Sequence, residues 1–212
     1  MMVLNRAINY AKGFPLALEV IGSNMCGRNI NECESTLDAF KLIPSKDIQQ
    51  VLKVSYDDLE HFEKEIFLDI ACFFKGESLG HIKYMVEAIH GFNNPSYFIG
   101  VLEDKCLINI EDSCIEMHDL IQDMGTEIVH QESSNEPGKR SRLWFHEDIV
   151  HVLEDHTGTD EVSIIIQHNL SECMEVNWDG KAFKSMKNLK VLIFENVELS
   201  ESPKYLPNSL KC

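Results

Sequence analysis

The residues whose types and spacing suit chemistry lie at one predicted corner, where a β-hairpin leads into a helix. Residues 107–110 and 114–117 predict two short strands, and the polar residues 111–113 between them predict a turn. After Met117 the apolar positions change to helical spacing. His118 therefore precedes a helix start, where unpaired backbone N–H groups can hold an anion.

Asp119 is expected to be the N-cap of this helix, because its carboxylate can accept a hydrogen bond from a backbone N–H of the first turn. Gln122 follows three residues later, so the two residues predict a capping box. A corner of this kind either binds a negatively charged group or only redirects the chain. These residues alone leave both interpretations open.

Motifs for catalysis are missing from the sequence. It has no glycine-rich loop followed by Lys-Ser/Thr, no GxSxG and no HExxH. His146, His151 and His156 recur at five-residue steps, and each step rotates a helix by about 140°, so they would not share a face as zinc ligands. We therefore expect no catalytic residue and no metal site.

Composition indicates where the protein resides. The longest apolar runs are too short to span a bilayer, and the first residues lack the pattern of a secretory signal. The seven cysteines form no CxxC pair, and their odd number favours reduced thiols. The sequence thus predicts a cytoplasmic or nuclear protein without a membrane span.

The pattern of elements predicts a mainly α fold with a small β content, in four parts. Residues 1–46 read as the end of a helical subdomain, and 47–131 as helices followed by the hairpin and a further helix, which is the outline of a winged helix. Residues 132–160 are expected to be a linker. From residue 161 the spacing becomes strand-like, and 161–212 resembles the start of a leucine-rich repeat domain.

Charge argues against DNA as the partner of the winged helix. Residues 47–131 contain seventeen Asp or Glu and five Lys or Arg, a net charge of −12 in a chain of net charge −16. The helix before the hairpin carries Glu103 and Asp104 and no arginine. Phosphate and base contacts need Arg and Lys, so we expect no direct DNA binding.

Two features of the second half allow alternatives. Lys139, Arg140 and Arg142 form a small basic cluster, which is either a solvated turn or a clamp on a neighbouring acidic domain.

The apolar segments 162–166 and 189–194 read as strands without neighbours to cover them, which predicts exposed edges and poor solubility. Both ends of the sequence read as cut within a domain, so we expect a piece of a longer protein.

Several local sequences together resemble one family, the plant disease resistance proteins with TIR, NB-ARC nucleotide-binding and leucine-rich-repeat domains. The matching segments are GFPLAL (13–18), SYDDL (55–59), FLDIACFF (67–74), MHD (117–119) and PGKRSRLW (137–144). In that family these segments belong to the nucleotide-binding domain, its winged-helix subdomain and the linker before the repeats. The resemblance covers nearly the whole chain.

The resemblance implies an ADP/ATP-dependent switch in defence signalling. Pro15, with Leu16 beside it, would contact the nucleotide next to its base and sugar. His118 would reach the β-phosphate of ADP and hold the closed, inactive arrangement, and Asp119 would support that corner. In a full-length relative the partners would be its own TIR, nucleotide-binding and repeat domains, together with pathogen effectors or host proteins.

The sequence also departs from the family pattern. Phe14 stands where the family usually has leucine, and no phosphate loop, metal-binding acidic strand or TIR domain is found in the 212 residues. We therefore expect weak or no nucleotide binding and no enzymatic activity, whereas a full-length relative would be a slow ATPase switch, with NADase activity in any TIR domain. The alternative is a non-enzymatic regulatory or decoy module that binds protein partners and no nucleotide.

Overall fold

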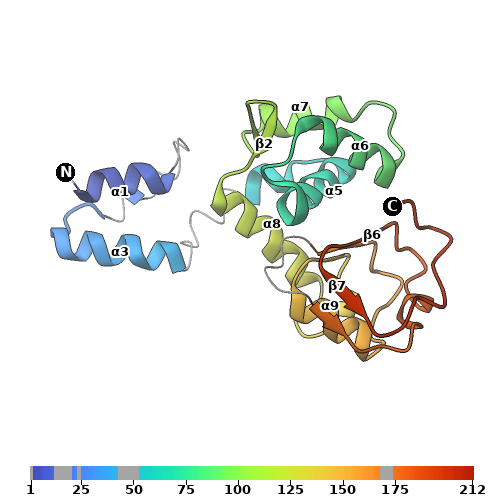
Figure 1. The fold of residues 1–212 in the computed structure, drawn as a ribbon. Coiled ribbons are helices and arrows are strands. Elements are labelled where there is room, and N and C mark those ends of the chain that lie inside the picture. Colours follow the sequence, from blue (N-terminus) through green and yellow to red (C-terminus); the bar gives the residue numbers. More distant parts are fainter. Residues whose placement is uncertain (1, 12–20, 23–24, 43–52, 168–173) are drawn as a thin grey trace.

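A pair of helices at the start of the chain forms a small unit of its own. The computed structural model describes residues 2–11, 21–22, 25–42, 53–167 and 174–212. Helices α1 (Met2–Ala11) and α3 (Ile30–Leu42) lie side by side (Figure 1). Ala7, Ile21 and Leu37 are buried between them. The sequence pattern also predicts a helix at 16–25 and a helix cap at Asp47, but most of that helix and Asp47 lie outside the described residues.

The second unit is the predicted winged helix. Its local sequence explains where several helices begin and end: Glu60 and Glu63 form a capping box, Ser78 caps α6, and Gly91 ends α6 at φ 76°. Its elements are α5 (His61–Asp69), the π-helix η1 (Ile70–Phe74), α6 (Leu79–His90), α7 (Pro95–Asp104), β1 (Asn109–Glu111), β2 (Cys114–Glu116) and α8 (Asp119–Glu132).

The core of the winged helix lies where α5, η1 and α8 meet. Ile66, Phe67 and Ile70 are fully buried there and pack in one cluster with Ile115 and Ile121 of the later elements. The helices also approach closely, because a Cβ added at Gly125 of α8 would lie 2.5 Å from the Cβ of Ala71. Glycine at this position therefore allows the two helices to touch.

The third unit contains a parallel sheet. It comprises η2 (Pro137–Lys139), β3 (Arg142–Leu143), α9 (His146–Glu154), β4 (Ile164–Gln167), β5 (Met174–Val176), η3 (Ala182–Lys184), β6 (Val191–Phe194) and β7 (Val197–Leu199). The sheet order is β3-β4-β6, and Arg142, Ile164 and Val191 are in register. Strands β5 and β7 form a separate parallel pair. Short parallel strands of this kind are consistent with the start of a leucine-rich repeat domain.

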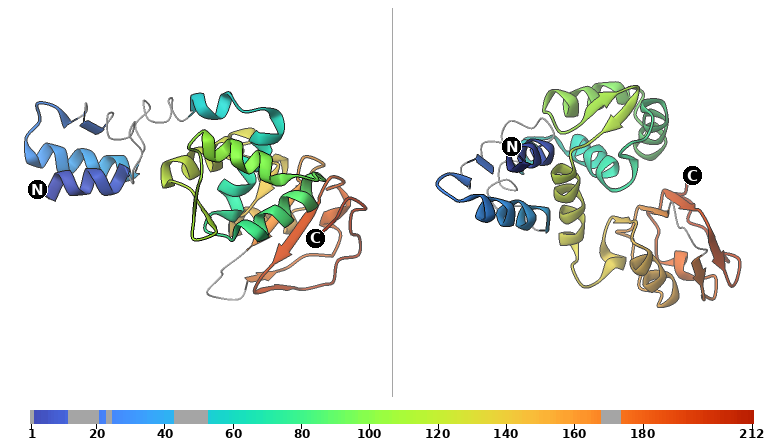
Figure 2. Two further views of the ribbon diagram at one scale, coloured as in Figure 1. Left: turned by 90° about the horizontal axis from the view of Figure 1, so that it is seen from above. Right: turned by 60° about the vertical axis from the view of Figure 1, so that its left-hand side comes forward.

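Both faces of β4 are covered, which corrects the expectation of an exposed strand at 162–166, whereas β6 lies at the edge of the sheet and is half-buried over 192–194. Ile164, Ile166 and Val191 belong to the core of the winged helix. Leu143 and Ile165 face the other way, into a second core with residues of α9 and η3. Figures 1 and 2 show the winged helix and the sheet as neighbouring units, and their side chains share one core. The neighbours that the sequence failed to indicate are β3 and the winged helix itself.

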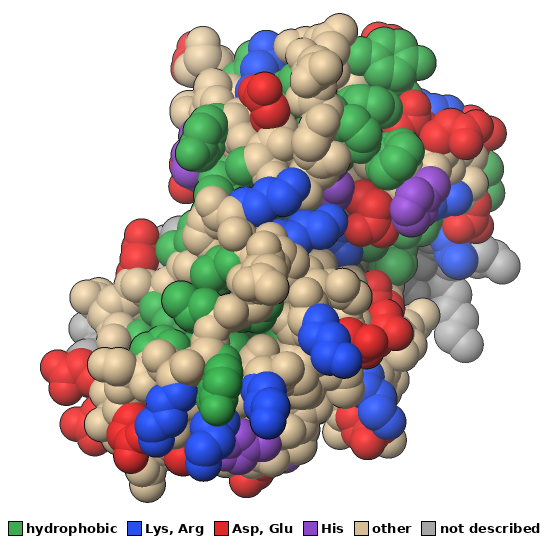
Figure 3. All heavy atoms as spheres, turned by 90° about the vertical axis from the view of Figure 1, so that its right-hand side faces the viewer, with side chains coloured by type: hydrophobic (Ala, Val, Ile, Leu, Met, Phe, Trp, Pro, Cys, Tyr) green, Lys and Arg blue, Asp and Glu red, His purple; other side chains and the backbone are tan. Residues whose placement is uncertain are grey.

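Charge is unevenly distributed along the chain. The acidic residues 47–131 contrast with 174–212, where six lysines accompany five acidic residues. Figure 3 shows Lys and Arg side chains gathered over the repeat-like unit on one face of the molecule. Within the described residues, no helix is both long enough and apolar enough to cross a bilayer.

Candidate functional site

His118, and not Asp119, is the N-cap of α8. His118 has extended backbone angles (φ −61°, ψ 139°), and its Nδ1 accepts a hydrogen bond from the backbone N–H of Leu120 at 3.1 Å. Asp119 is already the first helical residue. The prediction that Asp119 caps the helix was therefore wrong by one position. Strand β2 ends at Glu116, one residue before the predicted strand end at Met117.

This hydrogen bond fixes what the His118 ring can offer. A nitrogen that accepts a hydrogen bond carries no proton, so this geometry fits the ring tautomer in which Nε2 carries the N–H. In that tautomer the ring can donate a hydrogen bond beside a helix start. Backbone N–H groups and the positive end of the helix dipole add to its attraction for an anion.

The predicted capping box between Asp119 and Gln122 is replaced by contacts to Lys75. The Lys75 ammonium lies 2.6 Å from Asp119 Oδ1 and 2.9 Å from Gln122 Oε1. The amide nitrogen of Gln122 donates to the backbone oxygen of Ala71 at 3.2 Å. The first turn of α8 is thus tied to the end of η1 by side chains from both elements.

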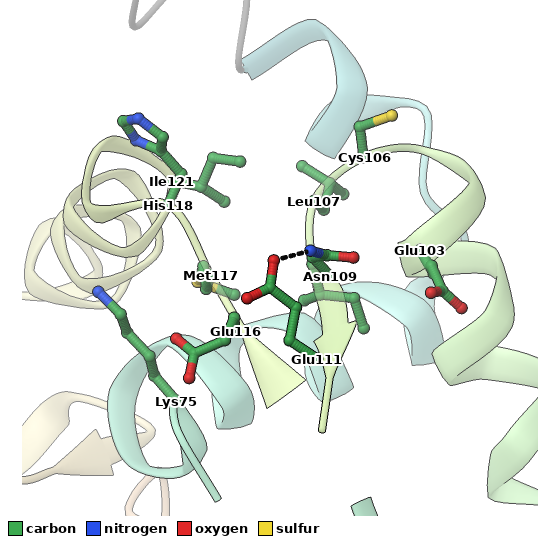
Figure 4. Close-up of a pocket in the computed structure, with 11 residues that line it drawn as sticks. Lys75, Glu103, Cys106, Leu107, Asn109, Glu111, Glu116, Met117, His118 and Ile121 are labelled. Carbon is green, nitrogen blue, oxygen red and sulfur yellow. Dashed lines mark hydrogen bonds between the residues drawn. The ribbon is translucent and has the colours of Figure 1, made fainter. Parts of the chain in front are cut away.

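A pocket of about 460 Å³ opens beside this corner, between α7, the hairpin and α8. Figure 4 shows His118 and Lys75 toward one end of it, and Asn109 with Glu111 across from them. The charged groups of its lining are Lys75, Glu103, Glu111 and Glu116, which gives a net charge of −2 if His118 is neutral. A polyphosphate would find hydrogen-bond donors here, but it would also meet three carboxylates.

Comparison with known proteins identifies the winged helix. The family model described as the winged-helix domain of Roq1-like disease resistance proteins matches residues 60–133. The chain is 38% identical over 206 residues to TMV resistance protein N of Nicotiana glutinosa, covering 97% of this chain and 18% of that protein. It is 37% identical over 197 residues to disease resistance protein RPP2B of Arabidopsis thaliana, covering 93% and 16%. For disease resistance protein RUN1 of Vitis rotundifolia the identity is 38% over 205 residues, covering 95% and 15%.

The chain is homologous to plant disease resistance proteins of the TIR-NB-LRR class. It spans between 15 and 18% of the length of these three relatives. In this disease resistance homologue, the matched winged-helix segment begins at the cap of α5 and ends just after α8. His118, Asp119 and Lys75 all lie within it.

The structure places only half of the predicted nucleotide site. His118 and Asp119 are adjacent at the corner, as expected from their sequence. Pro15 and Leu16 lie outside the described residues, so their distance from His118 stays a prediction. No group of His, Cys, Asp and Glu side chains in the described part of the chain is arranged to hold a metal ion.

A buried polar cluster in this disease resistance homologue connects the winged helix to the sheet. Asp69 of α5 accepts a hydrogen bond from Arg142 Nε at 2.7 Å and one from His90 Nε2 at 2.7 Å. Arg142 Nη2 donates to Glu65 Oε2 at 3.0 Å and to the Glu65 backbone oxygen at 2.9 Å. Of the two interpretations of the basic cluster, the clamp on an acidic neighbour is the correct one for Arg142.

The other two members of the basic cluster behave differently. Arg140 is also buried, and it donates to Asp148 of α9 at 2.6 Å and to the backbone oxygens of Ser133 and Ser134. Lys139 is exposed and pairs with Glu136 three residues before it. The solvated-turn interpretation therefore holds for Lys139 alone.

Sequence reasoning missed Lys75 and Asp69. Lys75 gave little signal, since it is one lysine directly after an apolar run and 44 residues from its partner Asp119. Asp69 could have been noticed, because it interrupts the apolar run 66–74, where an acidic residue needs a buried partner. Which residue supplies that partner depends on tertiary structure.

Proposed function

We propose that this chain is the ADP-sensing part of a nucleotide-dependent switch in a plant immune receptor. His118 would donate its Nε2–H to the β-phosphate of ADP, and this contact would favour the closed, inactive state. The observation that carries the proposal is the cap geometry of His118, whose Nδ1 accepts a hydrogen bond from the Leu120 N–H at the helix start while the residue lines the pocket. The motif MHD at 117–119 and homology to disease resistance proteins support it.

The charges of the pocket limit how tightly this chain would hold nucleotide. A hydrogen bond between His118 and a phosphate is charge-assisted and contributes about 1.5–3 kcal/mol. Three carboxylates in the same lining oppose a polyphosphate. In a longer receptor, the phosphate loop and a metal ion would supply the remaining attraction. We therefore expect binding by this chain to be weak, and we assign it no catalytic step.

Equilibrium binding to the purified 212-residue chain tests this function. We expect ADP to bind in isothermal titration calorimetry, and His118→Ala to weaken binding by about 10- to 100-fold because one charge-assisted hydrogen bond is lost. His151→Ala is the matched control, since His151 is an exposed histidine on α9 outside the pocket lining. Absence of ADP binding by the unmodified chain at millimolar nucleotide would contradict the proposal, as would equal binding by His118→Ala.

The second candidate is a module that binds protein partners and no nucleotide. The negative charge of the pocket and of residues 47–131 favours it over a nucleotide site. The same titration separates the two functions, because a partner-binding module gives no heat with ADP or ATP. In either case, pathogen effectors or host proteins are the expected partners of the full-length receptor.

A further inference from the structure

Lys75 lies at a junction between three elements of the winged helix. It directly follows η1, and the residues after it pair with the hairpin: Gly76 N–H donates to Ile115 O at 2.7 Å, and Ile115 N–H donates to Glu77 O at 2.9 Å. Ile115 belongs to β2, the strand that leads into His118. The backbone at Lys75 and the backbone approaching His118 are therefore held in one hydrogen-bonded unit.

The side chain of Lys75 completes this unit by reaching the first turn of α8. Its ammonium contacts Asp119 and Gln122, which are the first and fourth residues of the helix. The Lys75 side chain is 22% exposed, whereas that of Asp119 is 57% exposed. Lys75 thus fixes the position of the helix start from the side of η1, next to the backbone N–H of Leu120 that holds the His118 ring.

Electrostatics gives Lys75 a second effect. Asp119 adds a negative charge directly after His118, the residue proposed to donate a hydrogen bond to the β-phosphate. Asp123 adds a second negative charge one helical turn later. Burial raises the pKa of Asp123, the charge of Asp119 raises it further, and Lys75 acts in the opposite direction. Lys75 therefore offsets the like charges on this face of α8, which would otherwise repel each other and an approaching anion.

We propose that Lys75 is a positioning residue for the His118 corner. By pairing with Asp119 and Gln122 it holds the first turn of α8, so that His118 keeps Nδ1 on the Leu120 N–H at the edge of the pocket. The positioning stands on the contacts described above, while its effect on ADP rests on the proposed function. Lys75 itself need not touch the nucleotide.

Nuclear magnetic resonance of the full chain tests the positioning without any nucleotide. Lys75→Met removes the charge and keeps the length of the side chain, Lys75→Arg conserves the charge, and Lys139→Met is the control at an exposed lysine outside the pocket. We expect Lys75→Met to raise the hydrogen-exchange rate of the Leu120 amide about three- to tenfold and to mix the two ring tautomers of His118 in its 15N spectrum. Lys75→Arg and Lys139→Met should keep the original exchange rate and tautomer.

A charge exchange distinguishes pairing from a general loss of stability. The double variant Lys75→Asp/Asp119→Lys should restore part of the Leu120 protection that each single variant loses, because the pair is rebuilt in reverse. An unchanged Leu120 exchange rate and tautomer in folded Lys75→Met would overturn the proposal, and so would a double variant that is no better protected than either single one.

ADP titration of the same variants separates this proposal from the proposed function. If the unmodified chain binds ADP, Lys75→Met should weaken binding several-fold and Lys75→Arg should largely retain it. If no variant binds ADP, the proposed function fails, and the exchange and tautomer data still decide whether Lys75 positions His118. Loss of ADP binding in Lys75→Met with an unchanged His118 tautomer would contradict positioning and favour direct contact with phosphate.

Discussion

Arg142 and Asp69 form a buried ion pair that joins the first strand of the sheet to the first helix of the winged helix. Arg142 Nε lies 2.7 Å from Asp69 Oδ1, and their side chains are 1% and 0% exposed. His90 Nε2–H donates to the second oxygen of Asp69, and Glu65 faces the other side of the guanidinium. Burial alone would lower the pKa of Arg142, but Asp69 and Glu65 raise it above its usual value, so the pair is fully ionised.

We expect Arg142→Met to lower the free energy of unfolding by about 3–5 kcal/mol, because it leaves Asp69 buried without its main counter-charge. Urea denaturation followed by circular dichroism measures this change. Lys139→Met is the control, and an exposed pair of this kind should change stability by no more than about 0.5 kcal/mol.

The double variant Asp69→Leu/Arg142→Met gives a second test of the same pair. Replacing both charges by apolar side chains removes the need for compensation, so the double variant should be more stable than Arg142→Met alone. A loss below about 1 kcal/mol in Arg142→Met would show that the pair has little influence on stability.

The pair also predicts how stability depends on pH. Burial would raise the pKa of Asp69, but the charge of Arg142 and the hydrogen bond from His90 outweigh burial and hold the pKa below its usual value. A carboxyl whose pKa is lowered by folding stabilises the native state above its unfolded pKa of about 3.9, and this contribution is lost as pH falls through the lower native value.

The comparison of wild type with Asp69→Asn isolates this contribution. At pH 7 Asp69→Asn should be the less stable protein, and the difference should shrink as pH falls below about 4, because protonation of Asp69 in the unfolded chain then favours unfolding of the wild type. Denaturation midpoints at a series of pH values measure it. A difference that stays constant down to pH 2 would contradict the assignment of Asp69 as the ionised partner.

Much of the winged helix could be predicted from sequence, because its elements are defined locally. Apolar spacing predicts helices at 60–74, 81–89 and 95–104, where the structure has helices at 61–74, 79–90 and 95–104, and two short apolar segments around a polar turn predict the hairpin. The helix boundaries differ by one or two residues. The cap at His118 was missed because sequence ranks Asp above His as an N-cap, while the end of β2 decides which residue is in position.

The interface between winged helix and sheet could not be predicted, because it depends on residues far apart in sequence. Arg142 is 73 residues from Asp69, and β3 has only two residues, too few for a strand pattern. Without β3 and the winged helix as neighbours, β4 reads as an exposed strand. Its isoleucines are instead 0–2% exposed, so the predicted cause of poor solubility is absent for this strand.

Gly125 and Gly100 offer a matched pair of substitutions within helices. A Cβ at Gly125 would lie 2.5 Å from Ala71 Cβ and 3.2 Å from Phe67, whereas a Cβ at Gly100 meets nothing within 4 Å. We expect Gly125→Ala to lower the free energy of unfolding by about 1–3 kcal/mol through overpacking. Gly100→Ala should raise it by up to about 1 kcal/mol, since alanine favours the helical backbone. Thermal denaturation of both variants checks the opposite signs, and equal signs would contradict the close packing of α8 on η1.

Ile164 and Ile165 are neighbours in β4 and should report on different cores. Ile164 packs with the winged helix, and Ile165 packs with α9 and η3. Both are 1% exposed or less, so Ile→Ala at either position should lower the free energy of unfolding by about 2–5 kcal/mol through loss of apolar contact and a residual cavity.

The location of the damage distinguishes the two variants. Hydrogen exchange resolved by peptide should rise mainly in α5 and η1 for Ile164→Ala, because the cavity opens in the core that those elements share with the sheet. For Ile165→Ala it should rise mainly in α9 and η3. Alternating side chains of β4 face the two cores, which implies that the cores respond separately. The same exchange pattern in both variants would contradict this and show that the two cores unfold together.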